Sequence, residues 1–339
     1  MPMKGFTSPL WPIRYKPLPD ELLSSWLVRL AHGHGLKVQT FCNLIFGDRH
    51  QVWNRDIDRL GPDWLVKELS ARTGTSLQIA YGTTLRAYEG LLYPQFKLSG
   101  VLQWILTLQM YHRKHEGFGL QFCPLCLREG PAPYFRKSWR VAFNTVCPAH
   151  QCMMQDRCPV CETGVAFHRQ DMGKHDCPIP DTLAICHKCG FDLGQSGSTP
   201  IVSFDTQVDS WLNRACQQLG PACGCENVID IDTLGVMRQL GKLLVSPYST
   251  IKLHAHICSK LGVQKIPLST GRLAFELRPL LERHHLMQLL GWLMLDLEPR
   301  LRTAWRAKAV QYNHLCKDYN NAPAWFQATA LGFSDWRHR

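Results

Sequence analysis

The chain has 339 residues, of which 45% are hydrophobic, and a formal net charge of +11 at pH 7. This length suggests two or three domains with cores of their own, and no apolar run approaches the roughly 18 residues that would cross a bilayer. The basic balance points to a polyanionic partner, most commonly nucleic acid. The 15 cysteines and the lack of a signal peptide's apolar segment at the N-terminus predict a reducing compartment, the cytoplasm.

Residues 1–115 are expected to form a helical N-terminal domain. Asp20 is the expected N-cap of a first helix, because apolar residues then recur at helical spacing from Leu22 to Ala31. A glycine pair ends this helix, and a second helix is expected over 38–46, where Gly47 stops it.

The same layout returns between residues 63 and 86. Asp63 is expected to cap a helix over 64–72, Gly74 to turn the chain, and Ser76 to start the next helix. This pattern is the sequence form of a helix-turn-helix, although it equally describes any αα-hairpin. If the unit docks on DNA, base and phosphate contacts are expected around the second helix. The candidate residues are Arg72, Ser76, Gln78, Tyr81 and Arg86.

Four pairs of metal-ligand type, each with two residues between its members, crowd the region 116–200. They are Cys123 with Cys126, Cys147 with His150, Cys158 with Cys161, and Cys186 with Cys189. A two-residue gap lets a tight turn aim two ligand atoms at one tetrahedral ion, as zinc requires. A disulfide framework is the alternative, but it is typical of short secreted chains.

The spacing favours a sequential partition into two structural zinc ions. Cys123, Cys126, Cys147 and His150 would hold the first ion, and Cys158, Cys161, Cys186 and Cys189 the second, each set joining two knuckles as in a zinc ribbon. An interleaved pairing is possible. Eight filled positions leave no open site for a catalytic water, so both ions are expected to be structural.

Other potential donors in this region are left over by that partition. They are Cys152, Cys177, His168, His175 and His187, which we expect to be ordinary loop residues rather than ligands. The first ribbon loop also combines aromatic and basic residues. Tyr134 and Trp139 are expected to pack on the metal site, while Arg136, Lys137 and Arg140 remain candidates for phosphate contacts.

Residues 201–339 are expected to form a helical C-terminal domain. Apolar periodicity predicts helices over 208–219, 233–245, 250–261 and 280–295. A basic helix is expected over 299–308, where Arg302 and Arg306 share one face.

One segment of this domain raises an enzymatic alternative. His254 and His256, close to Tyr248, resemble the paired histidines and nucleophilic tyrosine of HUH-type DNA nickases. Those histidines lie on a strand, whereas here an amphipathic helix is expected, so the nickase interpretation is disfavoured. The chain also lacks the Gly-x-x-x-x-Gly-Lys-Ser/Thr motif of a phosphate loop.

Several motifs together resemble the TniQ/TnsD family of transposon target-selection proteins. The opening stretch from Pro17 to Ala31 is similar to the N-terminal signature of that family. The segments Phe122–Leu127, Tyr134–Trp139, Cys147–Gln151 and Cys158–Cys161 follow the order of its zinc core, and Cys186–Leu193 completes the second site. The inserted stretch 167–181 departs from the tightest form of the second ribbon.

The resemblance implies a non-catalytic adaptor of DNA transposition. Such proteins recognise a target, by DNA binding or by association with an RNA-guided CRISPR effector, and recruit an AAA+ ATPase; homodimers are expected. The implied architecture is mainly α, with a small zinc-ribbon domain over 116–200 between the helical domains 1–115 and 201–339. A zinc-ribbon or helix-turn-helix transcription regulator shares every feature seen in the residues alone and is the alternative.

Overall fold

The computed structural model describes residues 8–47, 51–111, 114–115, 117–130, 132–172, 178–219, 229–269 and 273–334. These residues divide into two compact units. The first is drawn from Met1–Glu89 and Gln95–Pro200, and the second from Gly90–Pro94 and Ile201–Arg339. The N-terminal helices and the cysteine-rich region, expected as separate domains, therefore lie within one unit.

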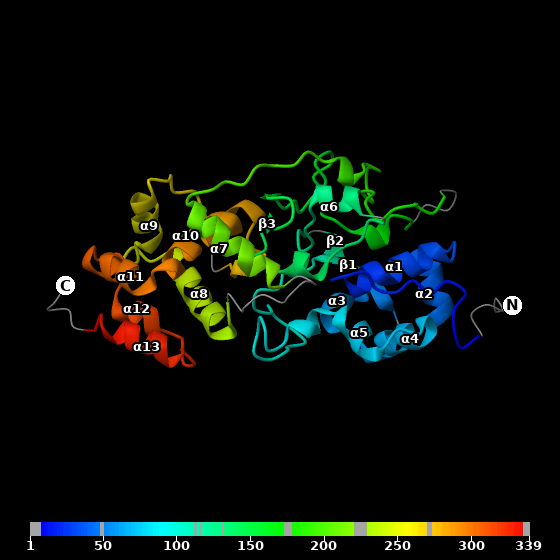
Figure 1. Ribbon diagram of the computed structural model, residues 1–339, viewed down its shortest axis with the longest axis horizontal. Helices are drawn as coiled ribbons and strands as arrows, with labels where there is room; N and C mark the ends of the chain where they lie inside the picture. Colours follow the sequence, from blue (N-terminus) through cyan, green and yellow to red (C-terminus); the bar gives the residue numbers. More distant parts are fainter. Residues whose placement is uncertain are drawn as a thin grey trace. The chain divides into compact units, whose positions relative to one another are not determined.

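The first unit combines short helices with two small antiparallel sheets (Figure 1). Its helices are α1 Leu23–Gly33, α2 Val38–Phe46, α3 Ile57–Leu60, α4 Asp63–Thr73, α5 Leu77–Gly82 and α6 Pro124–Glu129. Its strands are β1 Met110–Tyr111 paired with β2 Lys114–His115, and β3 Val146–Cys147 paired with β4 Cys152–Met153. The expected class, mainly α with short strands in the cysteine-rich region, is confirmed.

The N-terminal helices follow the predicted layout with two corrections. The helix over 38–46 is α2, and Gly47 follows it. Asp20 does not cap α1, which begins at Leu23; its carboxylate instead accepts a hydrogen bond from the backbone N–H of Ser138. This partner lies 118 residues further along the chain, so helical periodicity could not reveal it.

The two expected glycine turns adopt the conformation that favours glycine. Gly35 and Gly74 have φ angles of 67° and 63°. The second correction concerns the helix before Gly74, which begins at Asp63 itself after Pro62, with no capping bond from the Asp63 side chain. Ser76 caps α5 as expected, because its hydroxyl accepts a hydrogen bond from the backbone N–H of Ile79.

A buried ion-pair cluster joins the N-terminal helices to the cysteine-rich region. The Arg140 guanidinium contacts the carboxylates of Asp56 and Asp58, and it also donates to the carbonyl of Leu106 at 2.9 Å. Asp58 in turn accepts hydrogen bonds from the backbone N–H and hydroxyl of Ser24, at 2.7 and 2.8 Å. Burial, together with the neighbouring Asp56, raises the pKa of Asp58 to about 6. Arg140 therefore supplies the compensating charge for two carboxylates removed from water.

Helices are the regular secondary structure of the second unit among its described residues. Its helices are α7 Thr206–Gln217, α8 Ile231–Leu244, α9 Leu253–Leu261, α10 Leu280–Leu295, α11 Leu297–Arg306, α12 Tyr312–Cys316 and α13 Ala324–Leu331. Helix α10 contacts α7, α8, α9 and α11 and is buried along most of its length, including polar residues such as Glu282 and Arg283. No helix in the described ranges combines the length and apolar character of a membrane span.

Removing the Arg140 guanidinium should leave two carboxylates buried without a counter-charge. We expect Arg140→Ala to lower the free energy of unfolding of the first unit by about 3–5 kcal/mol, measured by urea denaturation with tryptophan fluorescence. Lys67→Ala is the matched control, since Lys67 and Asp63 are 61% exposed and lie 3.9 Å apart. Its cost should stay below about 1 kcal/mol. Equal effects of the two substitutions would contradict the role assigned to Arg140.

Candidate metal centres and nucleic-acid contacts

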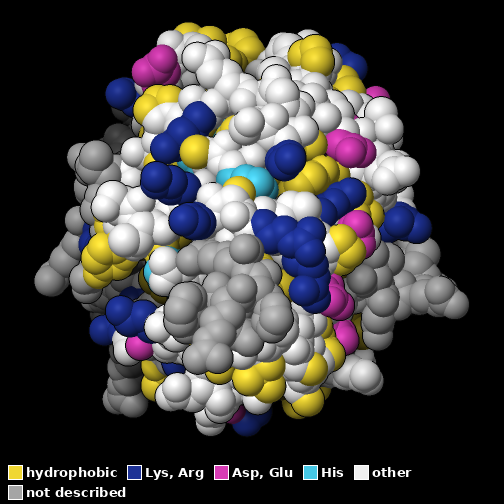
Figure 2. Space-filling model, turned by 90° about the vertical axis from the view of Figure 1, so that its left-hand side faces the viewer, with side chains coloured by type: hydrophobic (Ala, Val, Ile, Leu, Met, Phe, Trp, Pro, Cys, Tyr) yellow, Lys and Arg dark blue, Asp and Glu magenta, His cyan; other side chains and the backbone are white. Residues whose placement is uncertain are grey.

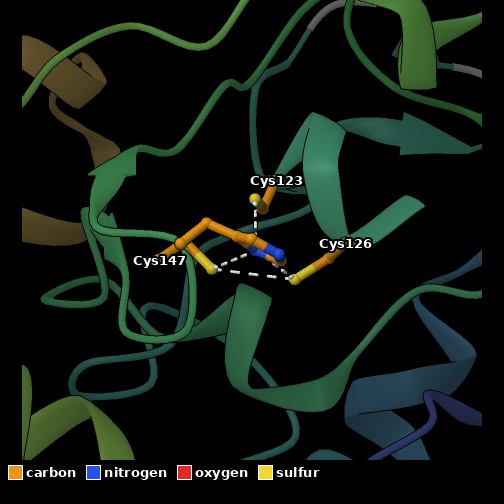
Figure 3. A group of neighbouring side chains, drawn as sticks. Cys123, Cys126 and Cys147 are labelled. Atoms are coloured by element: carbon orange, nitrogen blue, oxygen red, sulfur yellow. Dashed lines mark hydrogen bonds between the residues drawn. The ribbon is translucent and has the colours of Figure 1, made fainter. Parts of the chain in front are cut away.

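The first group of ligand-type residues converges on a single point. The sulfurs of Cys123, Cys126 and Cys147 face one another in Figure 3, and the Cys126 and Cys147 sulfurs lie 3.6 Å apart. His150 Nδ1 lies 3.3 to 3.5 Å from all three sulfurs. In a tetrahedral zinc site, bond lengths of about 2.3 Å to sulfur and 2.0 Å to nitrogen place two sulfurs about 3.8 Å apart and a sulfur about 3.5 Å from a nitrogen. The four residues therefore fit a tetrahedral zinc ion.

The thiols of this group need a cation to ionise together. Hydrogen bonds from the Cys126 and Cys147 thiols lower the pKa of Cys123 to about 3, whereas the same contact with Cys123 raises the pKa of Cys126. One thiolate is thus stabilised at the expense of its neighbours. A divalent ion would supply the charge that lets all three act as ligands.

His150 is oriented for ligation through Nδ1. Its other ring nitrogen, Nε2, lies 2.6 Å from Oε2 of Glu129, the last residue of α6. A carboxylate at this position accepts a hydrogen bond from the Nε2–H, which fixes the proton on Nε2 and leaves the Nδ1 lone pair directed at the sulfurs. Glu129 was not among the residues singled out from the sequence, because nothing in its local spacing marks it.

Local structure places the four ligands. Cys123 is the N-cap of α6, and Pro124 occupies the first helical position, where a missing N–H costs nothing. Cys126 lies within the same helix. Cys147 ends β3, and the turn to β4 carries His150 and has a left-handed residue at Gln151, with φ of 48°. A helix start and a hairpin turn thus each contribute two ligands.

The second group has the same character but is more open to solvent. The sulfurs of Cys158 and Cys189 lie 3.6 Å apart, as do those of Cys161 and Cys186, and all four ligand atoms lie within 4.8 Å of one another. Backbone bridges between 157 and 164 and between 185 and 192 close a small loop around each pair. These distances also suit a tetrahedral zinc ion with four sulfur ligands. The structure thus brings the eight candidate ligands together in the two sequential groups.

The rival donors lie outside these groups wherever the structure describes them. Cys152 pairs with Cys147 across the β3–β4 hairpin, and its sulfur lies 3.8 Å from that of Cys123. Burial raises the pKa of Cys152 to about 12, which keeps it a neutral thiol. His168 stacks on Trp53 with ring centroids 4.7 Å apart, and burial lowers its pKa to about 3. His187 belongs to neither group. His175 and Cys177 lie outside the described residues.

The candidate DNA contacts around α5 lie at the surface. Ser76 and Gln78 are exposed on the first turn of this helix, whereas Tyr81 donates a hydrogen bond to Asp63. The two arginines already have acidic partners: Arg72 Nε lies 2.7 Å from Glu68, and Arg86 lies 3.8 Å from Asp63.

The basic residues of the first ribbon loop are engaged inside the first unit. Arg140 is fully buried, so its expected phosphate contact is wrong. Lys137 donates to the carbonyl of Gly82 at 2.6 Å, and the Arg136 guanidinium lies over the rings of Tyr134 and Trp139. Both are half-buried, and DNA contact by them stays a prediction.

The residues of the nickase alternative do not converge. His254 and His256 are two residues apart on α9, so they point roughly 200° apart around the helix axis. His254 is buried against His285, His256 is half-buried, and Tyr248 is 55% exposed in the preceding loop. The histidine arrangement that would hold a nickase metal on a strand is therefore not formed.

The C-terminal unit carries exposed positive charge. Figure 2 shows Lys and Arg side chains gathered across the middle of the side on which α9 and α11 lie. The basic helix expected over 299–308 is α11, which ends at Arg306. Arg302 pairs with Glu298 at 2.7 Å and lies over Phe333, whereas the Arg306 side chain is exposed.

Single ligand substitutions should report the two zinc ions separately. We expect Cys123→Ser and Cys186→Ser each to lower the zinc content of the full chain by one ion relative to the unsubstituted protein, as measured by elemental analysis. Loss of a structural ion removes on the order of 10 kcal/mol of binding free energy from folding. Glu129→Gln should weaken zinc binding about 10- to 100-fold, because Glu129 orients His150.

Cys152→Ser is the matched control for these variants, since its sulfur borders the first group without belonging to it. Its zinc content should be unchanged. A loss of one ion in Cys152→Ser, or none in Cys123→Ser, would contradict the ligand assignment.

Residues 12–154 match the TniQ family model. The matched segment contains α1 to α6 and all four residues of the first ligand group, and it ends before the second group. No curated protein sequence is similar enough to the chain to count as a relative. Residues 12–154 therefore carry a TniQ domain, which supports a role associated with transposition.

Proposed function

We propose that this chain is a non-catalytic target-selection adaptor in DNA transposition. It links a target-recognition element, a DNA site or an RNA-guided CRISPR effector, to an AAA+ transposition ATPase. The observation that carries this proposal is the TniQ match over residues 12–154, which includes the first ligand group. The target and the ATPase come from the family resemblance.

Two structural zinc ions complete the proposed adaptor. Each of the two groups offers four protein ligands, so a bound ion would be closed to water and substrate. Such ions hold short loops in place and leave recognition to the protein surface. This is consistent with an adaptor rather than a metal-dependent hydrolase.

The exposed face of α5 supports both a DNA contact and a protein contact. Ser76 and Gln78 offer polar groups there, but Leu77 and Ile79 are 43% and 56% exposed on the same short helix. Apolar side chains left in water are typical of protein-binding surfaces. We therefore propose weak DNA binding through this face, strengthened in the assembled complex by a protein partner or by a second copy of the chain.

Salt-dependent binding to duplex DNA tests the nucleic-acid part of the proposal. We expect Arg72→Ala combined with Arg86→Ala to weaken binding at low salt and to reduce its salt dependence, because fewer phosphates are neutralised. Glu68→Gln is the complementary variant, with an effect expected in the opposite direction. It removes the ion-pair partner of Arg72 and should strengthen DNA binding. Identical affinities for these variants and the unsubstituted chain would exclude this face as the DNA contact.

Assembly with the transposition ATPase tests the adaptor role. We expect the full chain to co-purify with an AAA+ ATPase from its native host and to leave supercoiled DNA uncut with magnesium or manganese. Copurification with RNA polymerase and no ATPase would favour the transcription regulator. Nicking that disappears in both His254→Ala and Tyr248→Phe would establish the nickase instead.

A further inference from the structure

A third cluster of ligand-type side chains lies in the C-terminal unit, far in sequence from the two cysteine groups. His254 and Cys258 of α9 meet His285 of α10, and all three side chains are at least 95% buried. His254 Nε2 lies 2.9 Å from His285 Nε2, and Cys258 Sγ lies 3.8 Å from the same nitrogen. The three ligand atoms lie within 4.8 Å of one another.

We propose that His254, Cys258 and His285 form a third metal site, which takes Zn²⁺ or a similar divalent transition metal. Two imidazoles and one thiolate are the donor types that such ions prefer, whereas magnesium and calcium require oxygen ligands. Three protein ligands leave the fourth tetrahedral position to a water molecule.

The geometry is close to that of a tetrahedral ion. Bond lengths of about 2.0 Å to nitrogen and 2.3 Å to sulfur separate two nitrogens by about 3.3 Å and a nitrogen from a sulfur by about 3.5 Å. Two of the three contacts, 2.9 and 3.8 Å, lie within about half an ångström of these values. The ligand atoms of the third pair, His254 and Cys258, lie within 4.8 Å of each other.

Secondary structure explains why the three residues meet. His254 and Cys258 are four residues apart on α9, so they share one helix face. That face packs on α10, where His285 lies opposite. An ion here would cross-link α9 to the central helix of the unit.

A hydrogen bond between the two imidazoles is the alternative explanation. That hydrogen bond engages Nε2 of both rings, and it leaves Nδ1 of His254 without a hydrogen-bond partner, as a metal ion bound at Nε2 also would. The hydrogen bond alone gives Cys258 no role, whereas a metal ion engages all three side chains.

The surroundings separate the site from solvent and from competing carboxylates. The ring of Phe204 packs edge-on against His285 with centroids 5.2 Å apart. Glu282, one turn before His285, is an acidic group whose charge acts on both His254 and His285. Its carboxylate is already occupied by Arg278 and by the hydroxyl and backbone N–H of Ser269.

Zinc content of the full-length protein tests this site. We expect three ions per chain in the unsubstituted protein and one fewer in each of His285→Ala and Cys258→Ser. His256→Ala is the matched control, because His256 lies on the same helix outside the cluster, and it should keep all three ions. Equal zinc content in the unsubstituted protein and in His285→Ala would overturn the proposal and leave a hydrogen-bonded histidine pair only.

Cobalt substitution provides a readout that does not depend on a well-folded alanine variant. The full chain and its Cys258→Ser variant are each loaded with Co²⁺, and their absorption spectra are compared. The variant should show weaker sulfur-to-cobalt charge-transfer absorption, because one thiolate ligand is lost. Identical spectra would overturn the proposal. Cys123→Ser and Cys186→Ser report the ions of the two cysteine groups. Loss of metal from those groups is therefore distinguished from loss of metal from the third site.

Discussion

Mutual repulsion among closely packed sulfur ligands is the constraint on which the first unit depends. The described residues between Phe122 and Leu193 form one six-residue α-helix, short 3-10 helices, two-residue strands and turns, too little regular structure to hold the region together. Its sulfurs nevertheless lie 3.6 Å apart in both groups. Several thiolates occupy such a space together only with a shared cation, so we propose that metal binding and folding of this region are one equilibrium.

The metal-dependent region also supports the N-terminal helices. The backbone N–H of Leu22 donates to the carbonyl of Phe135, and Asp20 accepts from Ser138, so α1 begins against the first ribbon loop. The Arg140 cluster makes a second connection, to α3. The matched TniQ segment is thus a helical layer built onto the cysteine-rich loops. On the proposal of two structural zinc ions, its surfaces, including α5, would depend on that support.

Local patterns predicted much of this structure, and long-range contacts account for what they missed. The metal groups could be predicted because each pair lies within one tight turn, and α2 and α7 could be predicted because their apolar residues recur at helical spacing. Arg140 was misread as a surface cation because its partner Asp56 lies 84 residues away. The His254, Cys258 and His285 cluster was missed for the same reason, since only tertiary packing brings α9 and α10 together.

Hydrogen exchange of the full chain, with zinc and after its removal by a chelator, tests most directly whether metal binding holds the first unit together. We predict that metal removal exposes the backbone amides of Phe122, Met154 and Cys186, and also that of Leu22 at the start of α1, whose acceptors all lie in the metal-held region. The amides of α8, which belongs to the second unit, should stay protected. Unchanged protection of residues 122–193 in the metal-free protein would contradict this account.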